Sequence, residues 1–86
     1  PQIVSGFAVE RNKDRRRMTF SWDKQPAAEG YVIRWGVSPE RIDNAVMVYG
    51  NEAEFGFFDR DASYYLTIEA FNESGKSKPS KPIKVN

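Results

Sequence analysis

Residues 64–72 read YYLTIEAFN, the longest stretch of the chain in which apolar and polar side chains alternate. Successive side chains of a β-strand point to opposite faces, so the alternation predicts a strand with one buried and one exposed face. The buried face is expected to carry Tyr64, Leu66, Ile68 and Ala70. On the opposite face, Tyr65 and Phe71 are the aromatic side chains that we expect to be exposed.

Two earlier stretches show the same period of two. Residues 17–23 read RMTFSWD, and residues 31–37 read YVIRWGV. The parity predicts that these strands direct inward the side chains of Met18, Phe20, Trp22, Tyr31, Ile33 and Trp35. Further strands are expected at residues 3–9, 42–49, 52–58 and 81–85. The register of the strand at 42–49 stays open, because either Ala45, Met47 and Tyr49 or Val46 and Val48 could face inward.

Polar and turn-forming segments separate these strands, at residues 10–16, 24–30, 38–41, 50–51, 59–63 and 72–75. Pro79 and Pro82 lie just before and within the last strand, which suits a sheet edge because proline lacks the N–H that a neighbouring strand would need. Seven short strands at this spacing predict an all-β fold, a seven-stranded antiparallel β-sandwich of the immunoglobulin-like class. We expect a single domain over residues 1–86, excised from a larger protein.

The composition removes whole classes of function. The chain has no cysteine and no histidine, which excludes disulfides, zinc–thiolate sites, cysteine nucleophiles and imidazole catalysis, and we expect no cofactor. With 13 basic and 12 acidic side chains the net charge is +1, so no overall field favours a nucleic acid. No apolar run approaches the roughly 20 residues of a membrane span. We expect a non-catalytic domain that is monomeric in isolation.

Three short motifs could in principle indicate a phosphate-binding, calcium-binding or adhesion site. Arg15, Arg16 and Arg17 are interpreted as a solvated turn, because acidic residues lie close by and three basic residues make a short phosphate patch. Asp59 and Asp61 have a spacing seen in calcium loops, but the glycine and distal glutamate of such loops are missing. No Arg-Gly-Asp tripeptide occurs. None of these motifs predicts a metal or ligand site.

Over residues 3–85 the chain resembles the fibronectin type III family. Trp22 resembles the buried tryptophan of the second strand, residues 31–35 the aromatic alternation of the third, and residues 64–75 the sixth strand with its turn. In the family's tyrosine corner a leucine stands six residues before the strand-six tyrosine; here Phe58 and Tyr64 hold these places. Phe58 replaces that leucine, and Arg60 stands where a proline is usual. The resemblance implies a structural core that includes Trp22, Tyr31, Ile33, Phe58, Tyr64, Leu66 and Ile68.

A narrower resemblance concerns residues 31–40 and 64–75, which are similar to C-terminal fibronectin-like modules of bacterial glycoside hydrolases. It implies an extracytoplasmic accessory module, periplasmic, secreted or on the cell surface, that packs against or spaces a neighbouring, catalytic domain of the same polypeptide. Tyr65 and Phe71 are the expected docking surface. The alternative is a protein-binding repeat of a cell-surface receptor or adhesion protein, with its binding loops at residues 24–30, 38–41 and 72–76. A module that itself binds carbohydrate would need a row of exposed aromatic rings.

Overall fold

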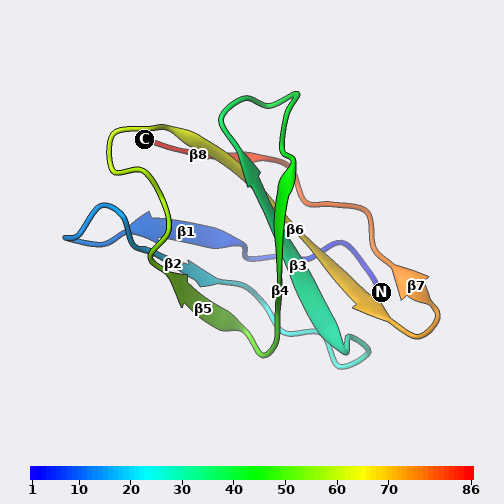
Figure 1. The fold of residues 1–86 in the computed structure, drawn as a ribbon. Helices are drawn as coiled ribbons and strands as arrows, with labels where there is room; N and C mark the ends of the chain where they lie inside the picture. Colours follow the sequence, from blue (N-terminus) through cyan, green and yellow to red (C-terminus); the bar gives the residue numbers. More distant parts are fainter.

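The chain folds into two antiparallel β-sheets that pack face to face (Figure 1). The computed structural model describes all residues from Pro1 to Asn86. One sheet has the strand order β1-β2-β5, and the other has the order β4-β3-β6-β7, with β8 also paired to β6. The strands are β1 (Ala8–Arg11), β2 (Met18–Ser21), β3 (Gly30–Gly36), β4 (Asn44–Val48), β5 (Glu52–Phe55), β6 (Tyr64–Asn72), β7 (Gly75–Lys76) and β8 (Ile83–Val85). The all-β sandwich expected from the sequence is confirmed.

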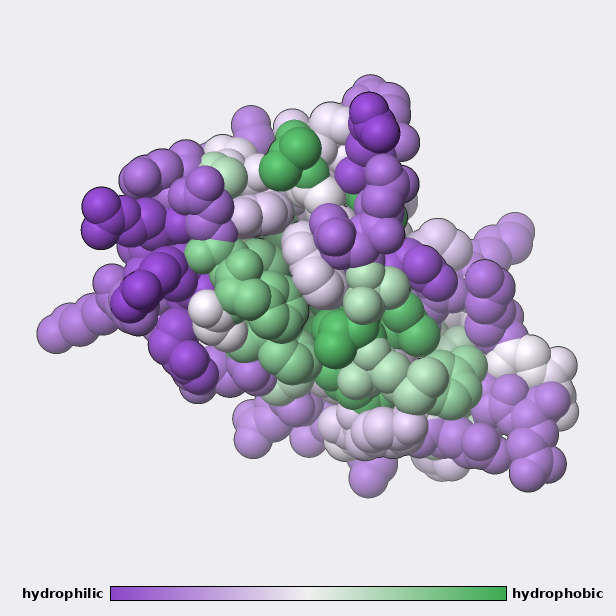
Figure 2. Space-filling view, viewed as in Figure 1, coloured by the Kyte–Doolittle hydropathy of each residue, from purple (hydrophilic) through white to green (hydrophobic).

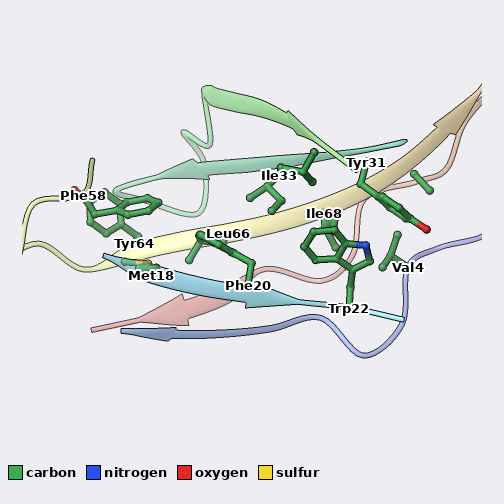
Figure 3. Close-up of a cluster of buried hydrophobic side chains, with 12 residues drawn as sticks. Val4, Met18, Phe20, Trp22, Tyr31, Ile33, Phe58, Tyr64, Leu66 and Ile68 are labelled. Atoms are coloured by element: carbon green, nitrogen blue, oxygen red, sulfur yellow. The ribbon is translucent and has the colours of Figure 1, made fainter. Parts of the chain in front are cut away.

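The core lies between the two sheets and is built from the alternating side chains of the strands (Figure 3). Met18, Phe20, Ile33, Leu66 and Ile68 have no exposed surface. The structure also buries Val4, Trp22, Tyr31, Val48, Phe58, Tyr64 and Ala70. The indole N–H of Trp22 donates to the carbonyl of Gly50 at 3.1 Å, so its one polar atom is paired inside the core.

The first strand begins later than the sequence suggested. We expected it at residues 3–9, but β1 starts at Ala8 and includes Glu10 and Arg11, which had been assigned to the turn. The reason is Gly6, whose φ of 70° breaks the extended backbone. A Cβ at Gly6 would lie 2.7 Å from the carboxylate of Asp23, so the chain turns beside that side chain before pairing with β2.

The register of the fourth strand is now fixed. In β4, Val46 pairs with Ile33 and Val48 with Tyr31 of β3, and both valines contact the core. Met47 therefore points away from it and is 55% exposed. The fifth strand is shorter than the expected residues 52–58, because β5 ends at Phe55 and the N–H of Phe58 bonds instead to the carbonyl of Arg16.

The eighth strand is β7, a short pairing at Gly75–Lys76 just after the expected turn, while the last strand expected at residues 81–85 is present as β8. β7 and β8 both pair with β6, and Pro79 and Pro82 lie between them. Serine hydroxyls bridge this interruption: the N–H of Ala70 donates to Ser77 Oγ at 2.9 Å, and the N–H of Ile68 donates to Ser80 Oγ at 3.0 Å. The edge of β6 is thus satisfied without a continuous partner strand.

The two termini lie at opposite ends of the sandwich (Figure 1). The domain measures 38 × 25 × 18 Å along its principal axes. β8 lies beside β6 near the carboxyl terminus, pairing Val85 with Tyr64. Because the core fills the space between the sheets, another molecule can contact the outer faces of the sheets, their free edges and the loops.

Candidate functional site

The outer face of the sheet β4-β3-β6-β7 carries the side chains expected to dock a partner. Tyr65 and Phe71 do share this face, but they lie opposite Gly36 and Gly30, at the two ends of β3. Six residues of extended strand separate them by about 20 Å. Both side chains are half-buried. They therefore do not form one surface patch.

An apolar patch does surround Phe71. A Cβ added at Gly30 would lie 2.6 Å from Phe71 Cζ and 3.0 Å from Tyr49 Cε1, so both rings extend over the bare backbone of this glycine. The hydroxyl of Tyr49 lies 2.9 Å from the sulfur of Met47 and donates to it. Tyr49 is 63% exposed. We refer to Met47, Tyr49 and Phe71 as the Phe71 patch.

Charged side chains border this patch on β3 and β6. Glu69 is only 4% exposed, which is unusual for a carboxylate. Its Oε1 accepts from Nε of Arg34 at 2.6 Å, and Lys76 Nζ lies 3.7 Å from its Oε2. The two cations offset the cost of removing this charge from water. Beside them, Pro79 and Pro82 line an open groove of about 630 Å³.

Tyr65, at the other end of β6, is covered from a different direction. The ammonium of Lys84 on β8 lies 5.8 Å from the centre of its ring, a cation–π contact. Lys84 is the residue that pairs with Tyr65 across the two strands. Tyr65 is therefore part of the β6–β8 contact, separate from Phe71.

A second group of aromatic rings joins the two sheets: Trp35 on β3, Phe55 on β5, and Phe57 just after β5. Phe57 stacks between Trp35 and Phe55, with ring centres 5.0 and 5.2 Å apart. Phe57 is nonetheless 54% exposed, so the cluster keeps an aromatic surface open to solvent.

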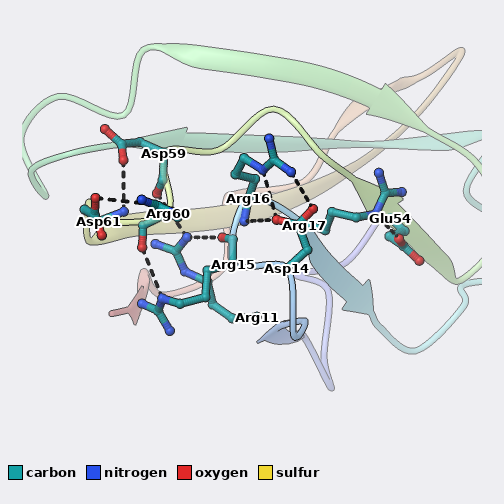
Figure 4. A network of polar contacts seen from close by, with 9 residues as sticks. All are labelled: Arg11, Asp14, Arg15, Arg16, Arg17, Glu54, Asp59, Arg60 and Asp61. Atoms are coloured by element: carbon teal, nitrogen blue, oxygen red, sulfur yellow. Dashed lines mark hydrogen bonds and ion pairs between the residues drawn. The ribbon is translucent and has the colours of Figure 1, made fainter.

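The arginines near the β1–β2 turn are held by other parts of the chain (Figure 4). Arg11 donates to the carbonyls of Arg15, Asp59 and Ala62. Arg15 donates to the carbonyl of Arg60 at 3.1 Å and to that of Asn86 at 3.0 Å. Desolvation by burial and the neighbouring Arg15 lower the pKa of Arg11. Through these hydrogen bonds the two guanidinium groups link the β1–β2 turn to the loop before β6.

The next two arginines form ion pairs. Arg16 Nε lies 3.0 Å from Asp14 Oδ1, and Arg17 Nε lies 2.6 Å from Glu54 Oε2. Hydrogen bonds from Arg16 lower the pKa of the Asp14 carboxyl, and the same pairing raises the pKa of Arg16. Residues 15–17, interpreted from the sequence as a solvated turn, are all exposed.

Acidic side chains do not gather into a metal site. The structure contains no group of three or more histidine, cysteine, aspartate or glutamate side chains placed to hold a metal ion. In the loop 59–63, Asp59 Oδ1 accepts the N–H of Asp61 at 2.9 Å, which closes a local turn. No helix with the length and apolar character of a membrane span is present.

The arrangement of the sheets matches solved structures closely. The FN1–FN3 domains of chicken CNTN1 superimpose with a TM-score of 0.83 at 21% identity, over 99% of this chain and 32% of that one. The sixth fibronectin type III domain of human fibronectin type III domain containing protein 3 gives a TM-score of 0.80 at 15% identity, over 99% of this chain and 83% of that one. The fold is that of a fibronectin type III domain.

The FN5 domain of Drosophila Lar has the same fibronectin type III arrangement, with a TM-score of 0.76 at 19% identity, over 99% of this chain and 94% of that chain. This chain thus spans about a third of the chicken fragment and nearly the whole of the Drosophila domain. No protein-family model and no curated protein matches the sequence. The comparisons therefore show the fibronectin type III fold and leave the function to be argued from the surface.

The tyrosine corner of the fibronectin type III fold is present despite its two departures. The hydroxyl of Tyr64 accepts the N–H of Asp59 at 2.8 Å. Phe58, in the place of the usual leucine, is 3% exposed, and its ring centre lies 5.2 Å from that of Tyr64. A larger apolar side chain thus fills the same end of the core, and Arg60 is accommodated in an exposed turn.

The three candidate binding loops are divided between the two ends of the sandwich. Residues 24–30 and 72–76 lie together, since the side-chain amide of Asn72 donates to the carbonyl of Ala27 at 3.0 Å. Residues 38–41 lie at the opposite end of β3 (Figure 1). The sequence missed the exposure of Met47 and Tyr49 because the register of β4 was open, and that of Phe57 because β5 ends three residues earlier than expected.

Proposed function

We propose that this domain is a non-catalytic interaction module that docks a neighbouring domain of the same polypeptide through the Phe71 patch. The observation that carries the proposal is the meeting of Tyr49 and Phe71 over Gly30. Methionine and aromatic side chains are enriched at the centres of protein interfaces, whose rims are polar. The patch has this composition, with Arg34, Glu69 and Lys76 beside it.

The role of the Phe71 patch is tested in the parent polypeptide by Tyr49→Lys. The charge would have to be buried against the neighbouring domain, so that domain should unfold at a lower temperature, as measured by calorimetry. Thr19→Lys is the matched control, since Thr19 is exposed on the other sheet. The isolated domain should tolerate both changes. Equal unfolding temperatures of the neighbouring domain in the two variants would contradict the proposal.

The parent that we propose is a secreted or surface bacterial glycoside hydrolase, which makes the module extracytoplasmic. This rests on the similarity of residues 31–40 and 64–75 to C-terminal modules of such enzymes. Sequencing the gene outward from both ends of this segment tests it. An export signal and a large domain with paired catalytic carboxylates are the expected result, whereas further sandwich repeats followed by a membrane span would support a receptor or adhesion repeat.

A further inference from the structure

The four outer strands of the two sheets differ in how they are protected against pairing with another strand. An exposed edge presents unpaired N–H and C=O groups, and proteins block it with charged side chains or prolines. β1 carries Glu10 and Arg11, and β5 carries Glu52 and Glu54. The β7–β8 edge is interrupted at Pro79 and Pro82.

β4 has none of these protections. It reads NAVMV from Asn44 to Val48, without a charge, a proline or a glycine, and β3 is its only partner. Along one side of β4, backbone groups of alternate residues are therefore directed away from the sheet without a partner strand. Of the edges in this domain, β4 is the one open to strand addition.

Exposed apolar side chains gather next to the same edge. Of the large exposed hydrophobic residues, Met47 lies on β4, Tyr49 directly follows it, and Phe57 stacks on Trp35, whose backbone pairs with Asn44 of β4. Figure 2 shows the resulting apolar band across the side of the molecule that carries β4 and β5. A partner strand on β4 would cover part of this band as well as pair the backbone.

We propose that β4 pairs with β4 of a second copy of this chain, antiparallel about a two-fold axis at Val46. In this register Ala45 faces Met47 of the second copy on the outer surface, so that a small side chain opposes a large one. Asn44 faces Val48 on the inner surface. The two sheets β4-β3-β6-β7 would join into one continuous sheet through the pair of edge strands.

Charge favours self-pairing at β4 over self-pairing at β5. β4 is uncharged, so its self-pairing brings no like charges together. The same pairing of β5 about Ala53 would place Glu52 directly opposite Glu54, which is unfavourable. Just beyond β4, the register brings Tyr49 opposite Asp43 of the second copy, so the carboxylate faces an uncharged side chain.

This inference goes beyond the docking function proposed above and does not rest on it, although Met47 and Tyr49 belong both to the Phe71 patch and to the residues at or beside the β4 pairing. Strand addition uses the edge of the sheet, and the two-fold axis leaves Phe71 of both copies on the same outer face. It replaces the monomer expected from the sequence with a dimer of the isolated domain.

Sedimentation velocity of the isolated domain over a wide concentration range tests the pairing. The wild type should shift from monomer to dimer, and the β4 amides should exchange more slowly with deuterium at high concentration. Ala45→Lys and Met47→Glu each place a charge directly opposite an apolar side chain of the second copy and should weaken the dimer by about tenfold. Both residues are exposed in the monomer, so folding should persist. Thr19→Lys, on the other sheet, should leave the dimer unchanged.

The double variant Ala45→Lys with Met47→Glu tests the register. Each lysine would face a glutamate of the second copy, twice per dimer, so association should recover relative to either single variant. A wild type that stays monomeric, or that forms only larger aggregates, would overturn the dimer. A double variant no tighter than the single variants would overturn the register at Val46.

Discussion

The hydroxyl of Tyr64 and the backbone N–H of Asp59 are joined by a hydrogen bond of 2.8 Å, which ties the start of β6 to the loop before it. The ring of Tyr64 is buried against Phe58 and lies 5.5 Å from the guanidinium carbon of Arg11. One side chain thus connects the core, the loop and the β1–β2 hairpin. Substitution of Tyr64 should therefore weaken the packing of the core, the loop and the hairpin together.

Tyr64→Phe should lower the free energy of unfolding by about 1–2 kcal/mol, because the N–H of Asp59 loses its acceptor while the ring still fills the core. Urea denaturation monitored by tryptophan fluorescence measures this. Tyr65→Phe is the matched control, as this tyrosine lies on the opposite face and outside the corner. A loss for Tyr64→Phe no greater than for the control would show that the corner adds no stability.

Arg11→Met should destabilise the domain by about 1–3 kcal/mol, because the carbonyls of Arg15, Asp59 and Ala62 lose a shared donor while methionine keeps the apolar stem. The midpoint of thermal unfolding is the measurement. Arg41→Met removes a guanidinium whose side chain is 80% exposed and should have little effect. Equal midpoints for both variants would contradict the role given to Arg11.

Ser77→Ala should cost about 1–3 kcal/mol of stability, since Ser77 is 4% exposed and its Oγ is the side-chain acceptor for the N–H of Ala70. The amide of Ala70 should also exchange faster with deuterium. Ser74→Ala, in the exposed β6–β7 turn, changes the same chemical group without this contact. Protection of the Ala70 amide that survives in Ser77→Ala would rule out the hydroxyl as its partner.

The Asp14–Arg16 pair predicts a pH-dependent contribution. The folded-state pKa of Asp14 lies below its ordinary value of 3.8, so the pair stabilises the fold above that value and the contribution disappears as the pH falls through the folded-state pKa. Asp14→Asn should therefore be less stable than the wild type at neutral pH and equal to it in strong acid. Denaturant unfolding at both pH values tests this. A difference that persists in acid would mean that the carboxylate is not its source.

Most of the fold could be predicted from alternation, because burial on one face fixes a period of two in long strands. Residues 64–72 and 17–23 were placed with the correct inward side chains for this reason. The start of β1 could not be placed, because it depends on a φ of 70° at Gly6 and on the nearby carboxylate of Asp23. Local sequence carries no signal for such a tertiary contact.

The docking surface was predicted only in part. Phe71 has the parity that places it on the outer face, but its neighbour there is Tyr49, which comes from another strand. Tyr65 has the same parity and yet is covered by Lys84. Which side chains meet across strands depends on the register of β4 and β8, and that register is set by packing against the core.

The placement of the termini at opposite ends has a mechanical consequence. The chain enters β1 from one end of the sandwich and leaves from β8 at the other, each strand running along the long dimension (Figure 1). Tension applied between the two ends would pull these strands along their own axes, across hydrogen bonds that lie perpendicular to them. The bonds of each ladder would then have to break together, in shear, which resists force better than unzipping them one at a time.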